Sequence, residues 1–232
     1  MVEDAHPSDM SRLGEHWRWR PEWRRDRACL WWYLTFEDAA AVRSLARRAQ
    51  DLLGRAPQLD LIPFPWLHLT LLEVGFADEV PGATVDRVAD TTRRALEDCP
   101  GFDLDLGPVH SLPGAVVLEA QGDALHALHE RLTDALLEAR GAEAVGALRA
   151  FVPHVSVAYV NRDCDPHEVM GPFDGADLSS PSPSATVTVT GVRLAAVTRE
   201  RRHYQWTTRA AVPLGGSGVP ALVAATARDG AR

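Results

Sequence analysis

Two short apolar segments of this sequence each contain a histidine followed two residues later by a hydroxyl side chain. His68 and Thr70 lie in one segment, and His154 and Ser156 lie in the other. Residues i and i+2 of a β-strand face the same side, so each histidine would share a face with its hydroxyl. An imidazole exchanges protons near neutral pH, and a hydroxyl donates a hydrogen bond to an oxyanion. Two such pairs facing one cleft would provide an acid, a base and two donors to an anion.

A single histidine–spacer–hydroxyl pattern carries little information, because a strand histidine can simply pack in the core or face water at a strand end. The pattern occurs a third time at His6 and Ser8, in a polar, proline-containing segment, and we interpret that copy as a chance occurrence. The other two copies differ in their setting, since the leucine and valine residues around them are typical of buried strands. The matched pair therefore favours a chemical role.

The elements on either side of these strands must position them. We expect a strand over residues 28–36 and a helix over 39–53, with Asp38 as its N-cap and Leu52 in its apolar stripe. Residues 59–62 predict a proline-bracketed turn. The remaining elements expected in order are the first histidine strand to residue 74, a helix over 84–97, strands over 102–106 and 115–120, a helix over 122–140, the second histidine strand over 151–160, a loop over 161–183, one long strand over 186–198, a basic turn over 199–202 and a last strand over 203–212. A strand–helix–strand unit that ends in a histidine strand therefore occurs twice, which indicates two related lobes.

Composition limits the class of protein and of partner. The formal net charge is −8 and the pI is about 5.6, whereas proteins that grip long nucleic acid through many phosphates are usually basic. No segment approaches the ~20 apolar residues that cross a bilayer, and the N-terminus does not resemble a secretory signal. The three cysteines are odd in number and far apart, which indicates a reducing compartment and no disulfide framework. We expect a cytoplasmic monomer without membrane or long-duplex partners.

The paired segments resemble the motifs of the two-histidine (2H) phosphoesterase superfamily, which includes bacterial 2′-5′ RNA ligase-like proteins and RNA 2′,3′-cyclic phosphodiesterases. The family motif is hydrophobic–His–hydrophobic–Thr/Ser–hydrophobic, and it occurs twice. Residues 67–71 fit it fully, while the second copy has Pro153 at its leading position. The resemblance covers residues 27–214, which we expect to be one bilobal domain. It leaves out a polar arm over residues 1–26 and a tail over 215–232, rich in Gly and Ala, that we predict to be disordered.

The resemblance implies an α+β fold with two pseudo-symmetric lobes, each a mainly antiparallel sheet with outer helices, and an active-site cleft between them. It implies a metal-independent phosphodiesterase that needs no cofactor and acts on 2′,3′-cyclic phosphate RNA ends or on small cyclic or 2′-5′ linked nucleotides. His68 and His154 would act as acid and base, and Thr70 and Ser156 would bind the non-bridging oxygens. The same groups could run the reaction backwards, as 2′-5′ ligation.

Residues that could bind the substrate are less specific. Trp66 would share a face with His68 in an extended strand and could stack on a base, although a core tryptophan is an equal alternative. Arg202 and Tyr204 could clamp a phosphate and stack near the mouth of the cleft, or be ordinary strand-edge residues. Tyr159 alternates onto the face behind His154, so we expect it in the core.

The polar arm and one helix carry further side chains that could bind ligands. Trp17, Trp19 and Trp23 of the arm lie among arginines and could stack on bases, but docking of these tryptophans on the body is the preferred interpretation. His126 and His129 are three residues apart on a predicted helix, a spacing that can hold a metal ion. No third ligand is obvious nearby, so we predict a surface pair and no metal site.

Two other functions remain open from the sequence. A module of the same fold could bind a nucleotide or an RNA end without turnover, although the intact histidine and hydroxyl pairs argue against lost catalysis. A protein with a small core and incidental histidines is the third possibility. Turnover that depends on both histidines and survives a chelator separates the first function from the other two.

Overall fold

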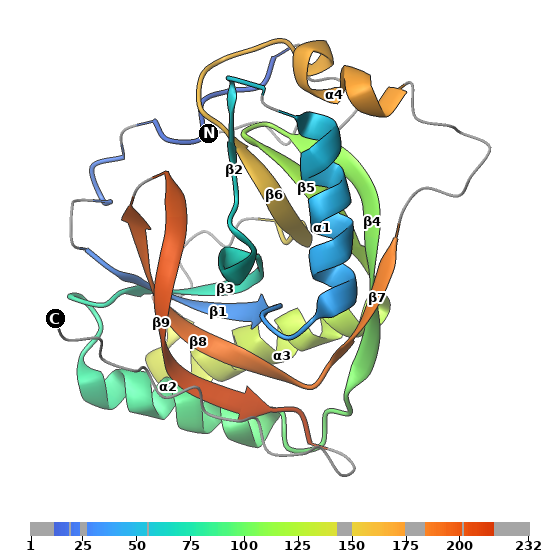
Figure 1. The fold of residues 1–232 in the computed structure, drawn as a ribbon. Helices are drawn as coiled ribbons and strands as arrows, with labels where there is room; N and C mark the ends of the chain where they lie inside the picture. Colours follow the sequence, from blue (N-terminus) through green and yellow to red (C-terminus); the bar gives the residue numbers. More distant parts are fainter. Residues whose placement is uncertain are drawn as a thin grey trace, which may run out of the picture.

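The computed structural model describes residues 12–18, 20–23, 27–54, 56–142, 150–174, 184–200 and 202–215 (Figure 1). Its strands are β1 (Cys29–Thr35), β2 (Leu59–Leu61), β3 (His68–Phe76), β4 (Phe102–Leu112), β5 (Ala115–Gln121), β6 (His154–Val160), β7 (Ala185–Val189), β8 (Gly191–Glu200) and β9 (His203–Pro213). Its helices are α1 (Ala40–Leu53), α2 (Gly82–Ala95), α3 (Asp123–Arg140) and α4 (Pro166–Asp174), with a short 3₁₀ helix, η2 (Phe64–Trp66). None of these helices combines the length and apolar character that a membrane span requires.

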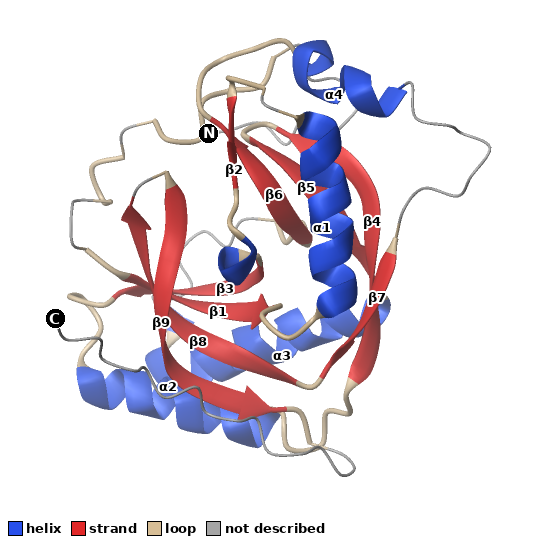
Figure 2. Cartoon of the chain, in the orientation of Figure 1, coloured by secondary structure: helices blue, strands red, loops and turns tan. Residues whose placement is uncertain are grey.

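The strands form one curled antiparallel sheet in the order β7-β4-β5-β6-β3-β1-β8-β9, with β2 paired to β6 (Figure 2). The first half of the sheet is β3-β1-β8-β9, and the second half is β7-β4-β5-β6. The two halves meet where Leu69 of β3 pairs with Val155 of β6. Further along β6, its residues 158–160 pair with β2 instead, so β3 and β6 diverge from that one pair. The α+β fold with two mainly antiparallel sheet halves and outer helices is therefore confirmed.

Each half of the sheet is covered by a helix that follows a strand of the other half. Helix α1 follows β1 of the first half but packs against β6 and β7 of the second (Figure 1). Helix α3 follows β5 of the second half but packs against α2 and β3 of the first. Their apolar stripes face the sheet, as an amphipathic helix requires. The buried residues are Val42, Leu45, Ala46, Ala49 and Leu53 in α1, and Leu125, Leu128, Leu132, Ala135, Leu136 and Ala139 in α3.

Each histidine strand contains a β-bulge directly after its hydroxyl residue. In β3 the pairing with β1 skips Leu71, and in β6 the pairing with β5 skips Val157. A bulge leaves one residue out of the ladder, so a buried carbonyl there needs another donor. Gln50 of α1 donates its Nε2 to the Val157 carbonyl at 2.9 Å, and His129 of α3 lies with Nδ1 2.9 Å from the Leu71 carbonyl. The crossing helices therefore support both irregular positions.

Several boundaries expected from the sequence are wrong. The strand expected over 186–198 divides at Thr190, because β7 pairs with β4 in the second half and β8 pairs with β1 in the first. Gly191 permits this crossing, since a Cβ there would lie 2.7 Å from the Val212 carbonyl oxygen. Residues 59–61 form strand β2 rather than a turn, and the expected loop after β6 contains helix α4.

The N-cap and the apolar stripe of helix α1 also differ from those expected. Its N-cap is Ala39 rather than Asp38, and no side chain caps it. Leu52, which we placed in the apolar stripe, is 43% exposed, while Leu45 is 4% exposed. The predicted stripe was one residue too wide, because the helix presents Leu53 rather than Leu52 to the sheet.

The N-terminal arm docks on the body of the protein. Leu13 is fully buried and forms a β-bridge with Cys164, and the His16 amide donates to the Val160 carbonyl at 2.8 Å. The docking expected for the arm's tryptophans is confirmed for two of them. Trp17 packs against Tyr159 and Tyr204, and Trp23 against Phe76 and Tyr204. Trp19, Arg201 and the predicted disordered tail beyond residue 215 lie outside the described residues.

The burial of α1 generates a matched test of the fold. Leu45→Ala removes a fully packed side chain and should lower the free energy of unfolding by about 2–5 kcal/mol. Leu52→Ala on the same helix removes an exposed leucine and should change it by less than about 1 kcal/mol. Chemical denaturation followed by circular dichroism measures both. Equal effects of the two substitutions would contradict the packing of α1.

Candidate active site

The structure brings the four residues of the two motifs together around the pair of Leu69 and Val155. Both of these side chains are fully buried, so alternation directs the polar side chains to the opposite face of the sheet. Because the strands are antiparallel, His68 lies on the same side of this pair as Ser156, and Thr70 lies on the same side as His154. We call the face that carries these four side chains the histidine face.

Both histidines make the same hydrogen bond to the backbone. Nδ1 of His68 lies 2.9 Å from the Trp66 carbonyl oxygen, and Nδ1 of His154 lies 2.7 Å from the Val152 carbonyl oxygen. A carbonyl only accepts, so these contacts assign the proton to Nδ1 of each neutral imidazole and leave Nε2 as the basic nitrogen. Each partner is the residue two positions earlier, so the approach of the chain to each strand holds the tautomer and the ring orientation.

Burial keeps these imidazoles neutral. Burial lowers the pKa of His68 to about 4; the hydrogen bond to the Trp66 carbonyl opposes this shift, and the nearby His154 adds to it. Burial also lowers the pKa of His154 below its usual value of 6.5, and His110 acts in the same direction. Removing a cation from water is costly unless an opposite charge is present, and an anion that enters the site would supply that charge.

Two tyrosines belong to the histidine face, and neither was identified as a site residue from the sequence. Tyr33 of β1 stacks on His68 at 4.3 Å between ring centroids, and its phenol interacts with the Thr70 side chain. The phenol of Tyr159 interacts in the same way with Ser156. Tyr159 is buried in the core as expected, at 3% exposed, but it lies on the histidine face rather than behind His154, because the bulge at Val157 reverses the alternation of β6. Burial raises the pKa of both phenols, so they are neutral hydroxyl groups.

The three residues expected to bind substrate lie on or near the first half of the sheet. Trp66 ends η2 rather than lying in a strand, and its ring meets Trp206 edge to face at 4.9 Å. The Trp206 ring itself lies 5.3 Å from the His68 ring, between centroids. Tyr204 lies 6.2 Å from the His68 ring.

Arg202 lies further from the histidines, in the turn between β8 and β9. It has a positive φ of 61°, and its Nη1 is 3.4 Å from Oδ2 of Asp60 on β2. This contact joins the tip of the β8–β9 hairpin to the second half of the sheet. The structure therefore groups Trp66 and Tyr204 around His68 and holds Arg202 at a bridge between the halves.

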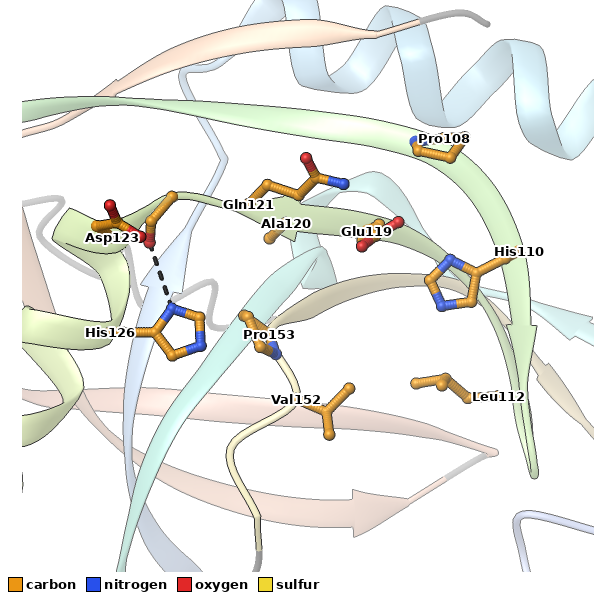
Figure 3. Close-up of a pocket in the computed structure, with 11 residues that line it drawn as sticks. Pro108, His110, Leu112, Glu119, Ala120, Gln121, Asp123, His126, Val152 and Pro153 are labelled. Carbon is orange, nitrogen blue, oxygen red and sulfur yellow. Dashed lines mark hydrogen bonds between the residues drawn. The ribbon is translucent and has the colours of Figure 1, made fainter. Parts of the chain in front are cut away.

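A cavity of about 500 Å³ lies on the second half of the sheet, lined in part by Val152 and Pro153, which directly precede His154 (Figure 3). Figure 3 shows His110 and His126 on opposite sides of it, with Pro153 between them. Glu119, which also lines the cavity, is the cross-strand partner of His154. The cavity therefore begins beside one of the two candidate histidines and is lined by both apolar and hydrogen-bonding side chains.

His126 lies on the surface as predicted, whereas His129 does not. His126 is exposed and contacts the Gly122 carbonyl at 3.3 Å, as a surface residue should. His129 is half-buried, stacks on Phe151 at 4.1 Å and contacts the Leu71 carbonyl, so it is a packing residue. Among the residues that the structure describes, no group of three or more His, Cys, Asp or Glu side chains could hold a metal ion.

Comparison with known proteins gives a family and a fold. The family model described as the 2′-5′ RNA ligase superfamily matches residues 36–201, which include both histidine motifs. Comparison with curated proteins found no significant match. Among solved structures, TT0787 of Thermus thermophilus has a TM-score of 0.63 and 20% identity, and covers 82% of this chain and 100% of its own.

Two crystal structures of Escherichia coli LigT are similar as well. The apo form has a TM-score of 0.60 and 17% identity, and covers 82% of this chain and 99% of its own. The complex with NADP⁺ has a TM-score of 0.59 and 18% identity, and covers 82% of this chain and 100% of its own. At these identities the likeness concerns the fold.

The burial of the histidine face can be measured directly. We expect NMR titration of the imidazole carbon-bound protons to give a pKa of about 4 for His68 and a pKa below 6.5 for His154. His68→Ala and His154→Ala spectra assign the signals. Inorganic phosphate should raise both values, because an adjacent anion favours the charged imidazole. A pKa at or above 6.5 for His68 in the phosphate-free protein would contradict the desolvated site.

Proposed function

This chain belongs to the 2′-5′ RNA ligase superfamily, and we propose that it is a phosphodiesterase that opens 2′,3′-cyclic phosphates on RNA ends or small nucleotides. The observation that carries the proposal is the matched pair of imidazoles, each held by a backbone carbonyl through Nδ1. The Leu69–Val155 pair places His68 next to Ser156 and His154 next to Thr70 on neighbouring strands. LigT has been crystallised with NADP⁺, ATP and 3′-AMP, and this supports a nucleotide ligand for the fold.

The proposed reaction needs one proton acceptor and one proton donor. A water molecule attacks phosphorus as the bond from phosphorus to one ribose oxygen breaks on the opposite side. Nε2 of one histidine takes the proton of the water, and Nε2–H of the other gives a proton to the leaving ribose oxygen. The second imidazole is charged at that moment, and the phosphate anion offsets the burial that otherwise lowers its pKa.

The hydroxyl residues would bind the non-bridging phosphate oxygens. Tyr33 and Tyr159 stay protonated because burial raises the pKa of each phenol. If each phenol donates to the oxygen of Thr70 or Ser156, the proton of that hydroxyl is free to point at the substrate. Neutral donors held in this way stabilise the negative charge that develops in the transition state.

The aromatic side chains near His68 are the proposed base-stacking surface. Trp66 and Trp206 meet edge to face, and Tyr204 lies beside the same histidine. Arg202 contacts Asp60, so its proposed contact with phosphate requires a shift from that partner. The free cysteines agree with a cytoplasmic location, and the acidic net charge agrees with action on RNA termini rather than on long duplexes. A monomer that needs no cofactor and takes part in RNA processing completes the proposal.

Substitution of either histidine tests the proposal. The assay follows opening of a 2′,3′-cyclic phosphate on a short RNA in the presence of EDTA, using wild type, His68→Ala, His154→Ala and the exposed control His167→Ala. We expect turnover by wild type and by the control, with losses of about 10²–10⁴ in kcat for the two site variants. The product, a 2′- or 3′-phosphate, identifies the leaving oxygen.

Two other outcomes of this assay would count against hydrolysis. Binding of nucleotide by folded wild type without turnover would favour a non-catalytic binding module. Turnover that is abolished by EDTA would contradict the metal-independent reaction.

The hydroxyl of Thr70 has its own matched test. Thr70→Val keeps the shape of the side chain and removes the donor, whereas Thr70→Ser keeps the donor. We expect Thr70→Val to lower kcat by about 10²–10³, as loss of one oxyanion donor does, and Thr70→Ser to lower it far less. Steady-state kinetics on the same cyclic phosphate measures both. Equal losses would assign Thr70 a packing role only.

A further inference from the structure

The N-terminal arm and the cavity beside His154 lie at opposite ends of strand β6. Val152 and Pro153, directly before the strand, line the cavity. At the other end, the amide of His16 in the arm donates to the Val160 carbonyl at 2.8 Å. His154 and Ser156 lie between these two ends. The strand therefore defines one direction across the candidate site, with space at one end and the arm at the other.

The ring of His16 fills the gap between the two sheet halves at the arm end. It stacks on Tyr159 of the second half at 4.1 Å between centroids, with an interplanar angle of 26°. Its Nε2 lies 3.0 Å from the hydroxyl oxygen of Tyr204, on β9 of the first half. A nucleobase that stacked on Tyr159 would need the place that this imidazole occupies.

The arm is fixed by contacts on both sides of His16. Trp17 donates Nε1 to Oδ2 of Asp60 at 3.0 Å, and Arg18 forms an ion pair with Asp163. The guanidinium of Arg199 donates to the His16 carbonyl at 2.5 Å. Burial, together with the nearby Arg199, lowers the pKa of His16 to about 3, so its ring is neutral at physiological pH. The arm precedes the segment over which the family model matches, residues 36–201.

We propose that the arm is an end wall, with His16 at its centre, that restricts the site to phosphates carrying a nucleoside on one side only. This inference rests on the proposed function and narrows its substrate class. A 2′,3′-cyclic phosphate is attached to a single ribose, whereas a 2′-5′ linkage has nucleosides on both sides of phosphorus. The single nucleoside has its base on the proposed stacking surface of Trp66 and Trp206, and the second would collide with His16, which already stacks on Tyr159. Reverse ligation is excluded for the same reason, because it needs a second nucleoside that bears a 5′-hydroxyl.

Binding of two nucleotide probes tests the wall without relying on turnover. Isothermal titration calorimetry compares 3′-AMP with a 2′-5′-linked adenosine dinucleotide on the full-length wild type, His16→Ala and the exposed control His167→Ala. Chromatography checks that the probes stay intact. We expect wild type and the control to prefer the mononucleotide by at least about tenfold, and His16→Ala to reduce this preference by about tenfold or more.

A second variant and a melting curve guard against a folding artefact. Trp17→Ala removes the indole contact with Asp60 and should shift the preference in the same direction as His16→Ala. Thermal melting checks that both variants are folded. Equal binding of both probes by wild type, binding of neither, or an unchanged preference in both folded variants would overturn the end wall.

The wall and the proposed hydrolysis can fail separately. If the variants relax the preference but no protein opens a cyclic phosphate, the wall stands as a selector of ligands and the hydrolysis fails. If wild type opens cyclic phosphates and the dinucleotide binds as well as 3′-AMP, the hydrolysis stands and the wall fails.

Discussion

The backbone pair between Leu69 and Val155 is the constraint on which the rest of the site depends. It is the point at which β3 and β6 join the two halves of the sheet, and both side chains are completely buried. Strict alternation about that pair places two imidazoles and two hydroxyls on one face. A register shift of one residue in either strand would turn its histidine into the core and its apolar residues outwards, at a large cost in burial. The packing of the core thus enforces the geometry of the polar groups.

Support for this pair comes from helices that cross between the halves. The bulges at Leu71 and Val157 leave buried carbonyls out of the ladder with the neighbouring strand. The Leu71 carbonyl contacts His129 of α3, and the Val157 carbonyl accepts from Gln50 of α1 and from the Ile62 amide at 3.0 Å. Gln50 of α1 also donates to the Ile62 carbonyl at 2.8 Å, so it ties the segment before β3 to β6. An unpaired buried carbonyl would cost about 1–3 kcal/mol. The irregular strands that direct Tyr159 to the histidine face are therefore stable only within the complete tertiary structure.

Desolvation sets the electrostatic character of the site. The imidazoles that face it are buried and neutral, and the two closest phenols are also neutral. The histidine face itself offers neutral donors and rings, and the fixed positive charge nearest the arm is the Arg199 guanidinium, which lowers the pKa of His16. An anion bound beside an imidazole raises the pKa of that imidazole and favours its protonated form. Ligand binding and the charge of the site are therefore coupled. The arm belongs to this arrangement, because His16 contributes a third neutral ring at the boundary of the two halves.

The sequence by itself determined the family resemblance, the α+β class and the four motif residues, because alternation and hydrophobic periodicity are local properties of the chain. It did not determine the positions of Tyr33, Tyr159 and His16, which depend on a strand register, a bulge and the docking of a distant arm. The same limit explains the error at Thr190, where an unbroken alternating pattern hides a crossing between sheet halves. Leu52 and Leu53 are adjacent leucines, and only the packing of α1 decided which one is buried. Local pattern fixes which face a residue can take, whereas pairing between distant segments decides what that face meets.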